Sequence, residues 1–317
     1  MIFVYLFIFV IACFVLVRSG AILVKIMASL CRYFRITEYV FSFLIMAFAT
    51  TIPELFVGIT AAFNKSPVIS LGNVIGSNLV NLSFILGMVA IAARGLRIES
   101  RIARKDSWIA LFIVLLPLAL LFDKKISRGE GFLLLAVFGL HIYYLLKSND
   151  LYRQRVHHIK DDISVRGKLL INIFLFIIAL AFLIFSAWTV VKSAEMIAKE
   201  LYIPMTLISI ILVAFGTSLP ELVFGIKAVI AKHEGLSLGN LFGAAVVNST
   251  FILGITAIIC PIRVENLRIL LVGIGFMILA ILFANIFIAS KKEVSVKEGL
   301  ALVGIYLIFL IVEFLFK

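Results

Sequence analysis

The chain has 317 residues, of which 63% are hydrophobic and only 15% are charged. Soluble domains are about 45–50% apolar and about 25% charged, so this composition excludes a soluble globular protein and predicts a chain that lies mostly in lipid. The net charge of +12 would suit a nucleic-acid partner, but the basic residues lie at the ends of apolar segments, which excludes that class.

About ten apolar segments are each long enough to cross a bilayer, which takes about 20 residues. The first, near 2–17 or extending past Arg18, has no basic leader and no clear cleavage site, so we expect a retained helix rather than a signal peptide. The others lie near 39–63, 69–93, 106–122, 130–147, 168–198, 204–231, 236–260, 267–289 and 297–315. The sequence therefore predicts an all-α polytopic membrane protein, with a first five-helix half (1–147), a connector (148–167) and a second five-helix half (168–317).

The basic residues predict how the chain is oriented in the membrane. If the N-terminus lies outside, the stretches that face the cytoplasm contain 20 of the 29 Lys and Arg residues. Cytoplasmic loops are enriched in these residues. We therefore expect a multi-pass protein of the cell membrane with both termini outside and the 148–167 connector in the cytoplasm.

The two halves contain an internal repeat. Residues 41–91 align with 208–258 without a gap, at a constant offset of 167, and 24 of the 51 positions are identical. The densest matches are AFATTIPE (47–54) with AFGTSLPE (214–221), and GNVIGSNLVN (72–81) with GNLFGAAVVN (239–248). Because an odd number of helices precedes the connector, the second copy is expected upside down in the membrane. Inverted repeats are common in secondary transporters, whose binding sites form near the bilayer midplane where the copies meet.

Each copy carries one glutamate inside an apolar segment, Glu54 in the first and Glu221 in the second. A charge at the bilayer centre costs at least about 2.5–3.5 kcal/mol, so such residues commonly mark an ion pathway. Thr50 and Thr217 lie four residues before the glutamates and hence on the same helical face. Each glutamate also follows a proline, which frees backbone carbonyls in the preceding turn. Carboxylate, hydroxyl and carbonyl oxygens are ligands of Ca²⁺, so the two copies predict a cation site.

The second block of each copy ends in an asparagine, Asn81 or Asn248, whose amide oxygen could line the same cavity. The glycines before them do not form a phosphate loop, because the GxxxxGK[ST] pattern is absent. A purely structural role is the alternative, since prolines, glycines and amides also pack and bridge membrane helices. The two glutamates at equivalent repeat positions favour the ion site.

These paired motifs resemble those of the cation/calcium exchanger family, and specifically its sodium/calcium exchangers. That family carries G-T/S-S-x-P-E followed by G-N/S-x-x-G-S-x-x-x-N/D in each repeat. The resemblance implies a ten-helix inverted-repeat fold in which Glu54 and Glu221 bind calcium and share in sodium binding, while Thr50 and Thr217 supply oxygens to calcium. The sodium ligands that it implies are the hydroxyls of Thr51, Ser77 and Ser218 and the carbonyls of Ala47 and Ala214.

The sequence departs from the family pattern at several positions, and in the first copy Ala49 replaces the usual glycine and Thr51 the usual serine. Ala244 stands where the first copy has Ser77, so one potential sodium ligand is missing. Asn248 occupies a position that is acidic in the potassium-dependent branch, which argues against potassium co-transport. The connector is also too short for the large regulatory domain of animal members, so no such domain is expected.

We therefore expect a secondary active antiporter that exchanges sodium for calcium by alternating access. A proton-coupled exchanger of calcium or another divalent cation is the alternative. A channel is less favoured, because inverted repeats around one charged site suit alternating access better. An enzyme is not expected, since the spans contain no nucleophile–base pair or zinc ligand set. The expected partners are Na⁺, Ca²⁺ and the lipid bilayer, with no cofactor and no nucleic acid, and the sequence leaves the oligomeric state open.

Overall fold

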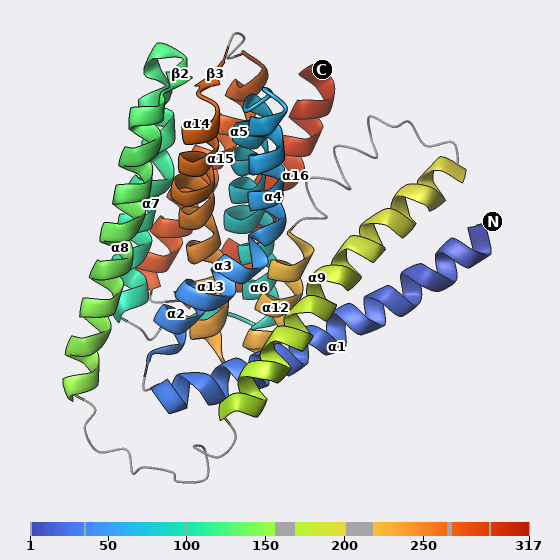
Figure 1. Cartoon of the computed structure of the whole chain (residues 1–317). Helices are drawn as coiled ribbons and strands as arrows, with labels where there is room; N and C mark the ends of the chain where they lie inside the picture. The colour runs from blue at the N-terminus through green and yellow to red at the C-terminus, as the bar shows by residue number, and fades with distance from the viewer. Residues whose placement is uncertain are drawn as a thin grey trace.

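Figure 1 shows the computed structural model of the chain, which describes residues 2–34, 36–98, 101–155, 169–200, 218–264, 268–291 and 293–316. These ranges are almost entirely helical, because lipid offers no partners for backbone N–H and C=O groups and a helix satisfies them internally. The prediction of an all-α polytopic membrane protein is confirmed. In chain order, with π-helices and one 3-10 helix labelled η, the elements are α1 (Ile2–Phe34), α2 (Glu38–Phe41), η1 (Ser42–Met46), α3 (Ala47–Thr50), α4 (Ile52–Phe63), α5 (Val68–Leu79), η2 (Val80–Ile85), α6 (Leu86–Ala92), β1 (Leu96–Arg97), α7 (Arg101–Leu120), η3 (Leu121–Asp123), β2 (Lys125–Ile126), α8 (Arg128–Arg155), α9 (Leu169–Glu200), α12 (Leu219–Ile230), α13 (Glu234–Val247), η6 (Asn248–Ile252), α14 (Leu253–Ile259), β3 (Ile262–Arg263), α15 (Arg268–Lys291), β4 (Glu293–Val294) and α16 (Val296–Phe316).

Within the described ranges, eight helices are long and apolar enough to cross a membrane. A ninth span results if Glu38–Thr50 and Ile52–Phe63, which meet at a bend of 49°, are counted as one. These nine correspond to nine of the ten expected segments. The remaining segment, 204–231, lies partly outside the described residues, which include only its end as α12.

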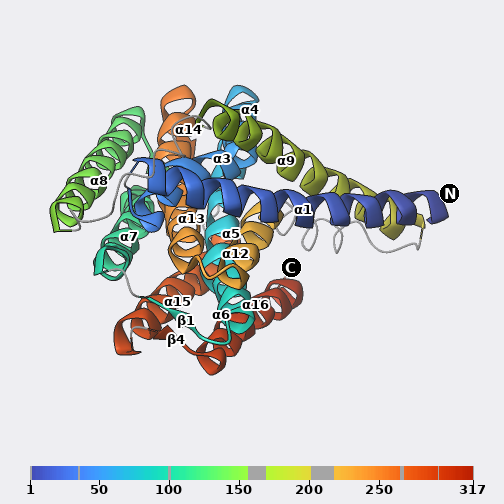
Figure 2. The same ribbon diagram turned by 90° about the horizontal axis from the view of Figure 1, so that it is seen from below.

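Helix α1 continues to Phe34, well past the end that the sequence predicted near residue 17. Its basic residues Arg18 and Lys25 are exposed, whereas Leu23 and Met27 are fully buried. The charges therefore lie on one face of a continuing amphipathic helix rather than at its end. Helix α1 packs along α9, and the pair leans away from the other helices (Figures 1 and 2).

Two short antiparallel strand pairs connect loops that are far apart in the sequence. Strand β2 pairs with β3, with Ile126 opposite Ile262, and β1 pairs with β4, with Leu96 opposite Val294. All four of these apolar side chains are fully buried. The β2–β3 pair lies at the top of Figure 1, and the β1–β4 pair lies at the opposite end, which Figure 2 shows from below. Each pair therefore joins one loop of the first half to one loop of the second.

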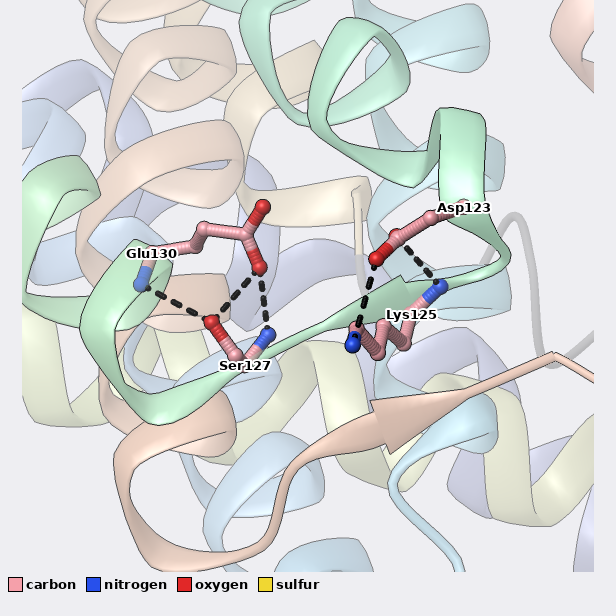
Figure 3. A network of polar contacts seen from close by, with 4 residues as sticks. All are labelled: Asp123, Lys125, Ser127 and Glu130. Atoms are coloured by element: carbon pink, nitrogen blue, oxygen red, sulfur yellow. Dashed lines mark hydrogen bonds and ion pairs between the residues drawn. The ribbon is translucent and has the colours of Figure 1, made fainter.

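Helices α8 and α16 begin with the same hydrogen bonds, although they lie in different halves. In Figure 3 the backbone N–H and the hydroxyl of Ser127 each donate to Oε2 of Glu130 at 2.7 Å, and the N–H of Glu130 lies 3.3 Å from Ser127 Oγ. Ser295 and Glu298 repeat this capping box at 2.7, 2.7 and 3.4 Å. The same figure shows Lys125 of β2 paired with Asp123 at 3.4 Å. The capping boxes fix the starts of both helices directly after β2 and β4.

Candidate functional site

The span that carries Glu54 is interrupted at the residues expected to bind ions. Helix α3 ends at Thr50 and α4 begins at Ile52, with Thr51 between them in a non-helical conformation. Pro53 lies in the first turn of α4, where its missing N–H removes no helical hydrogen bond. The Ala47 carbonyl at the break accepts bonds from the N–H and the hydroxyl of Thr51, at 3.1 and 2.9 Å. The expected break therefore exists, with the Ala47 carbonyl engaged by local donors.

Glu54 and Glu221 occupy equivalent places, each in the first turn of a helix. Helix N-termini favour negative charge, so α4 and α12 both stabilise a carboxylate at this position. The two side chains are 1% and 0% exposed. Among the described residues, neither carboxylate oxygen of Glu221 has a hydrogen-bond partner. Because burying an ionised carboxylate without a partner is costly, Glu221 is a candidate cation ligand.

Residues from the first half lie close to Glu221. Helix α3, which ends at Thr50 beside the break, packs against α12, which carries Glu221, and against α13. Thr50 is fully buried and donates to Oδ1 of Asn240 on α13, 3.2 Å away. We call Glu54, Glu221, Thr50 and Asn240 the glutamate site. It joins the break in the first half to α12 and α13 of the second.

Buried amides form a second polar group that joins the two halves. The Nδ2 group of Asn248 donates to Oδ1 of Asn78 at 3.1 Å, and Nδ2 of Asn78 donates to the hydroxyl of Ser249 at 2.8 Å. All three side chains are at most 1% exposed. In the described part of the chain, Oδ1 of Asn248 and Oδ1 of Asn81 have no hydrogen-bond partner. These two buried amide oxygens are available as cation ligands.

The other residues predicted from the sequence are partly described. Thr51, Ser77 and Ser218 are 1–2% exposed, and Ala244 is fully buried on α13. Thr217 and Ala214 lie outside the described residues. Where the structure describes the chain, no group of three or more His, Cys, Asp or Glu side chains is arranged to hold a metal ion. A cation here would therefore use the two carboxylates together with neutral oxygens.

Asn240, Asn78 and Ser249 were not identified from the sequence. Asn240 had a usable signal, because it aligns with Asn73 as an identical residue inside the second repeated block. Asn78 and Ser249 had none, since they align with Ala245 and Leu82. Their hydrogen bond joins positions that are not equivalent in the two copies.

The match to a known family covers nearly the whole chain. The model of the sodium/calcium exchanger protein family matches residues 4–147 and 171–315. The chain belongs to this family. The resemblance inferred from the paired motifs is thereby confirmed.

Relatives and solved structures agree with this assignment. The sodium/calcium exchanger MaX1 of Methanosarcina acetivorans is 26% identical over 336 residues, which cover 94% of this chain and 95% of that protein. The inner membrane protein YrbG of Escherichia coli is 25% identical, over 93% of this chain and 92% of that protein. A solved structure of the sodium-calcium exchanger NCX_Mj superposes with a TM-score of 0.83 at 25% identity, covering 97% of this chain and 98% of that one. The fold of this exchanger-family member is thus shared over its full length.

Proposed function

We propose that the chain exchanges Na⁺ for Ca²⁺ across the cell membrane at the glutamate site. The observation that carries the proposal is the pair of buried carboxylates, Glu54 and Glu221, which occupy equivalent places in the first turns of α4 and α12. Two negative charges balance one divalent or two monovalent cations. A cation between them relieves their repulsion and replaces the water that each carboxylate lost on burial.

The proposed calcium ligands are the two glutamates with Thr50 and, by the repeat, Thr217. In the repeat, Thr217 and Asn73 are the counterparts of Thr50 and Asn240, which are joined by a hydrogen bond. The residues proposed to serve sodium are Thr51, Ser77, Ser218, Asn81 and Asn248 through their side chains, and Ala47 and Ala214 through their carbonyls.

We propose that the chain works by alternating access between two inverted five-helix repeats. The strand pairs support this arrangement, because β1–β4 and β2–β3 each join the two halves and lie at opposite ends of the bundle. The matching capping boxes of α8 and α16 also support it. A site where two such repeats meet can open to either side by rocking one part against the other.

Calcium uptake into proteoliposomes under imposed Na⁺, K⁺ or H⁺ gradients tests the function. We expect an outward Na⁺ gradient to drive uptake, with no response to K⁺. Uptake driven only by a proton gradient would show that protons, rather than sodium, are the coupling ion. Uptake that needs no counter-ion gradient would show a channel.

The proposed orientation puts both termini outside and residues 148–167 in the cytoplasm. It is tested by placing single cysteines in a background that lacks Cys13, Cys31 and Cys260. A cysteine near Arg155 should resist an impermeant thiol reagent added to intact cells and react once the cells are opened. Labelling of intact cells at this position would reverse the proposed topology.

A further inference from the structure

A second buried polar cluster lies outside the glutamate site. It consists of Tyr39 on α2, Asp106 on α7 and His141 on α8, which are 1%, 0% and 4% exposed. We call these three residues the Asp106 cluster. The Tyr39 hydroxyl donates to Oδ2 of Asp106 at 2.5 Å, and Nε2 of His141 lies 3.3 Å from Oδ1. Three helices therefore bring three titratable side chains together in the interior.

The Asp106 cluster is neutral when Asp106 and His141 share one ionisable proton. The pair is then either a carboxylate beside an imidazolium or a carboxylic acid beside a neutral imidazole. Losing that proton leaves a net negative charge, and gaining another leaves a net positive one. Net charge is costly in a buried site, so the cluster binds and releases protons in discrete steps. Each added proton makes it more positive.

We propose that the Asp106 cluster is a proton-binding site that weakens cation binding at the glutamate site when it takes up a proton. The proposal rests on the cation exchange proposed above. Its ligand is H⁺, and its effect is separate from any competition between protons and cations for the glutamates themselves.

The two sites share one run of backbone. Tyr39 begins the run α2–η1–α3, which ends at Thr50 of the glutamate site. Phe43, in the π-helical part of this run, packs its ring against that of His141, with 5.2 Å between the centroids. π-Helical turns recur at functional sites, and here one lies between the two clusters. A shift at Tyr39 or Phe43 therefore passes along the helix to Thr50.

Helix α13 holds this run in place at both clusters. The hydroxyl of Ser42 donates to the Leu236 carbonyl at 2.7 Å, and Thr50 donates to Asn240 at 3.2 Å. Between these bonds, Gly239 meets Tyr39 so closely that a Cβ atom would lie 2.2 Å from the Tyr39 carbonyl oxygen. Helix α13 and the segment α2–η1–α3 are therefore in close contact at Tyr39. A movement of Tyr39 consequently displaces Asn240 as well.

The charge of the Asp106 cluster also acts on a cation at the glutamate site. Tyr39 and Thr50 are 11 residues apart, or about 16 Å along a helix. Both clusters are buried, so bulk salt screens their interaction only weakly. A more positive Asp106 cluster repels the cation, and at an effective dielectric constant of about 20 one added charge lowers the affinity for Ca²⁺ by about thirtyfold.

The other titratable groups around the cluster are Tyr144, Lys105, Glu38 and Glu234. On α8, the ring of Tyr144 stacks against that of His141, with 6.1 Å between the centroids. Nζ of the exposed Lys105, on α7, lies 5.6 Å from the centroid of the Tyr144 ring. On α2, Glu38 pairs with His233 at 2.7 Å, and Glu234 is the first residue of α13. Each of these stays unchanged in the cluster variants below, so differences between variants and wild type report the Asp106 cluster.

The test is the calcium concentration that half-saturates sodium-driven uptake, measured in proteoliposomes between about pH 5.5 and 8.5. The key variant is Asp106→Asn with His141→Gln, which keeps the side-chain sizes and removes both titratable groups. In the wild type this concentration should rise as the pH falls. The double variant should lose about thirtyfold of that rise. His233→Gln, which removes a histidine outside the cluster, should keep the wild-type profile.

Tyr39→Phe gives a second, milder test that keeps the ring and removes only the hydroxyl. Without this donor the Asp106 carboxylate holds its proton more tightly, so the midpoint of the pH profile should move to higher pH. An unchanged profile in either the double variant or Tyr39→Phe would overturn the proton site while leaving the exchange intact. If the wild type shows no sodium-dependent uptake at any pH, the proposed exchange and the proton site both fail.

Discussion

The glutamate site and the Asp106 cluster differ in how the two halves contribute to them. Glu54 and Glu221 are equivalent residues, one from each half. The Asp106 cluster comes from the first half alone: counted from the capping serines Ser127 and Ser295, which are 168 residues apart, the counterpart of His141 is Phe309. Phe309 packs against the rings of Phe276 and Tyr306 at 5.6 and 6.0 Å. The duplicated core thus carries the two buried carboxylates, and the first half adds a titratable cluster where the second has aromatic packing.

The glutamate site is itself symmetric in charge but not in its neutral oxygens. Ser77 has Ala244 as its counterpart, and Asn78 has Ala245. The second half supplies Ser249 instead, at the position of Leu82, and this hydroxyl accepts the Asn78 bond. The two halves therefore contribute different neutral oxygens. Single substitutions can test the shared carboxylates and the unshared oxygens separately.

The largest effect is expected from the shared charges. Glu54→Gln and Glu221→Gln should each abolish calcium transport, because a divalent cation then lacks one of its two balancing charges. Removing one partner of a buried charge pair costs about 3–5 kcal/mol, or more than a hundredfold in affinity. Calcium uptake and thermal unfolding of the purified variants should show lost transport in a folded protein.

Glu130→Gln is the matched control for the glutamate variants. It removes a carboxylate from the capping box of α8, where glutamine can still accept the bonds of Ser127. Transport should stay near the wild-type level. Near-normal uptake by either Glu54→Gln or Glu221→Gln would refute the glutamate site.

Gly239 lies between the two clusters, so Gly239→Ala tests both at once. Its new methyl group would overlap the Tyr39 carbonyl, and α13 must move away from α2. We expect about 3 kcal/mol of destabilisation, typical of an overpacked interior, together with weaker calcium binding because Asn240 moves as well. Thermal unfolding and calcium titration measure the two effects.

Gly275→Ala provides the comparison for Gly239→Ala, since Gly275 is an exposed helical glycine with no described atom near its Cβ position. Alanine there should be neutral or stabilising by up to about 1 kcal/mol. Equal unfolding temperatures for the two variants would mean that α13 and α2 are not tightly packed at Gly239.

Asn78 is expected to orient Asn248 so that its amide oxygen, not its NH₂ group, is available to a cation. Asn78→Leu removes the acceptor of the Asn248 donor, and an unsatisfied buried donor costs about 1–2 kcal/mol. Calcium or sodium affinity should fall by about tenfold. Asn285→Leu, on α15, removes another buried amide whose donor bonds Ile281 at 2.9 Å, and it should change stability without changing affinity. Equal affinity losses in the two variants would leave Asn78 without a role at the site.

The sequence predicted the parts of this protein that follow from lipid and from the repeat. The length of the apolar segments located the helices. The duplicated motifs singled out Glu54, Glu221 and Thr50 as candidates, because a charge in lipid is costly and its recurrence in both copies indicates a function. The end of α1 near residue 17 was too early, and the open extension past Arg18 was right, since exposed basic residues on a continuing helix resemble a boundary. Asp106 and His141 are 35 residues apart on different helices, and only the packing of α7 against α8 brings them together.

The smallest effect is expected at Ala244, where the second half lacks the hydroxyl that Ser77 supplies in the first. Ala244 is fully buried on α13, four residues before Asn248, so a serine there would place an oxygen on the same helical face. We expect Ala244→Ser to strengthen sodium binding by about 1 kcal/mol, the usual net worth of one polar contact, or about fivefold. The measurement is the sodium concentration that half-inhibits calcium uptake, with its Hill slope, and it should fall in the variant. If both the concentration and the slope match the wild type, Ala244 does not border a sodium site, and the two halves differ there in packing alone.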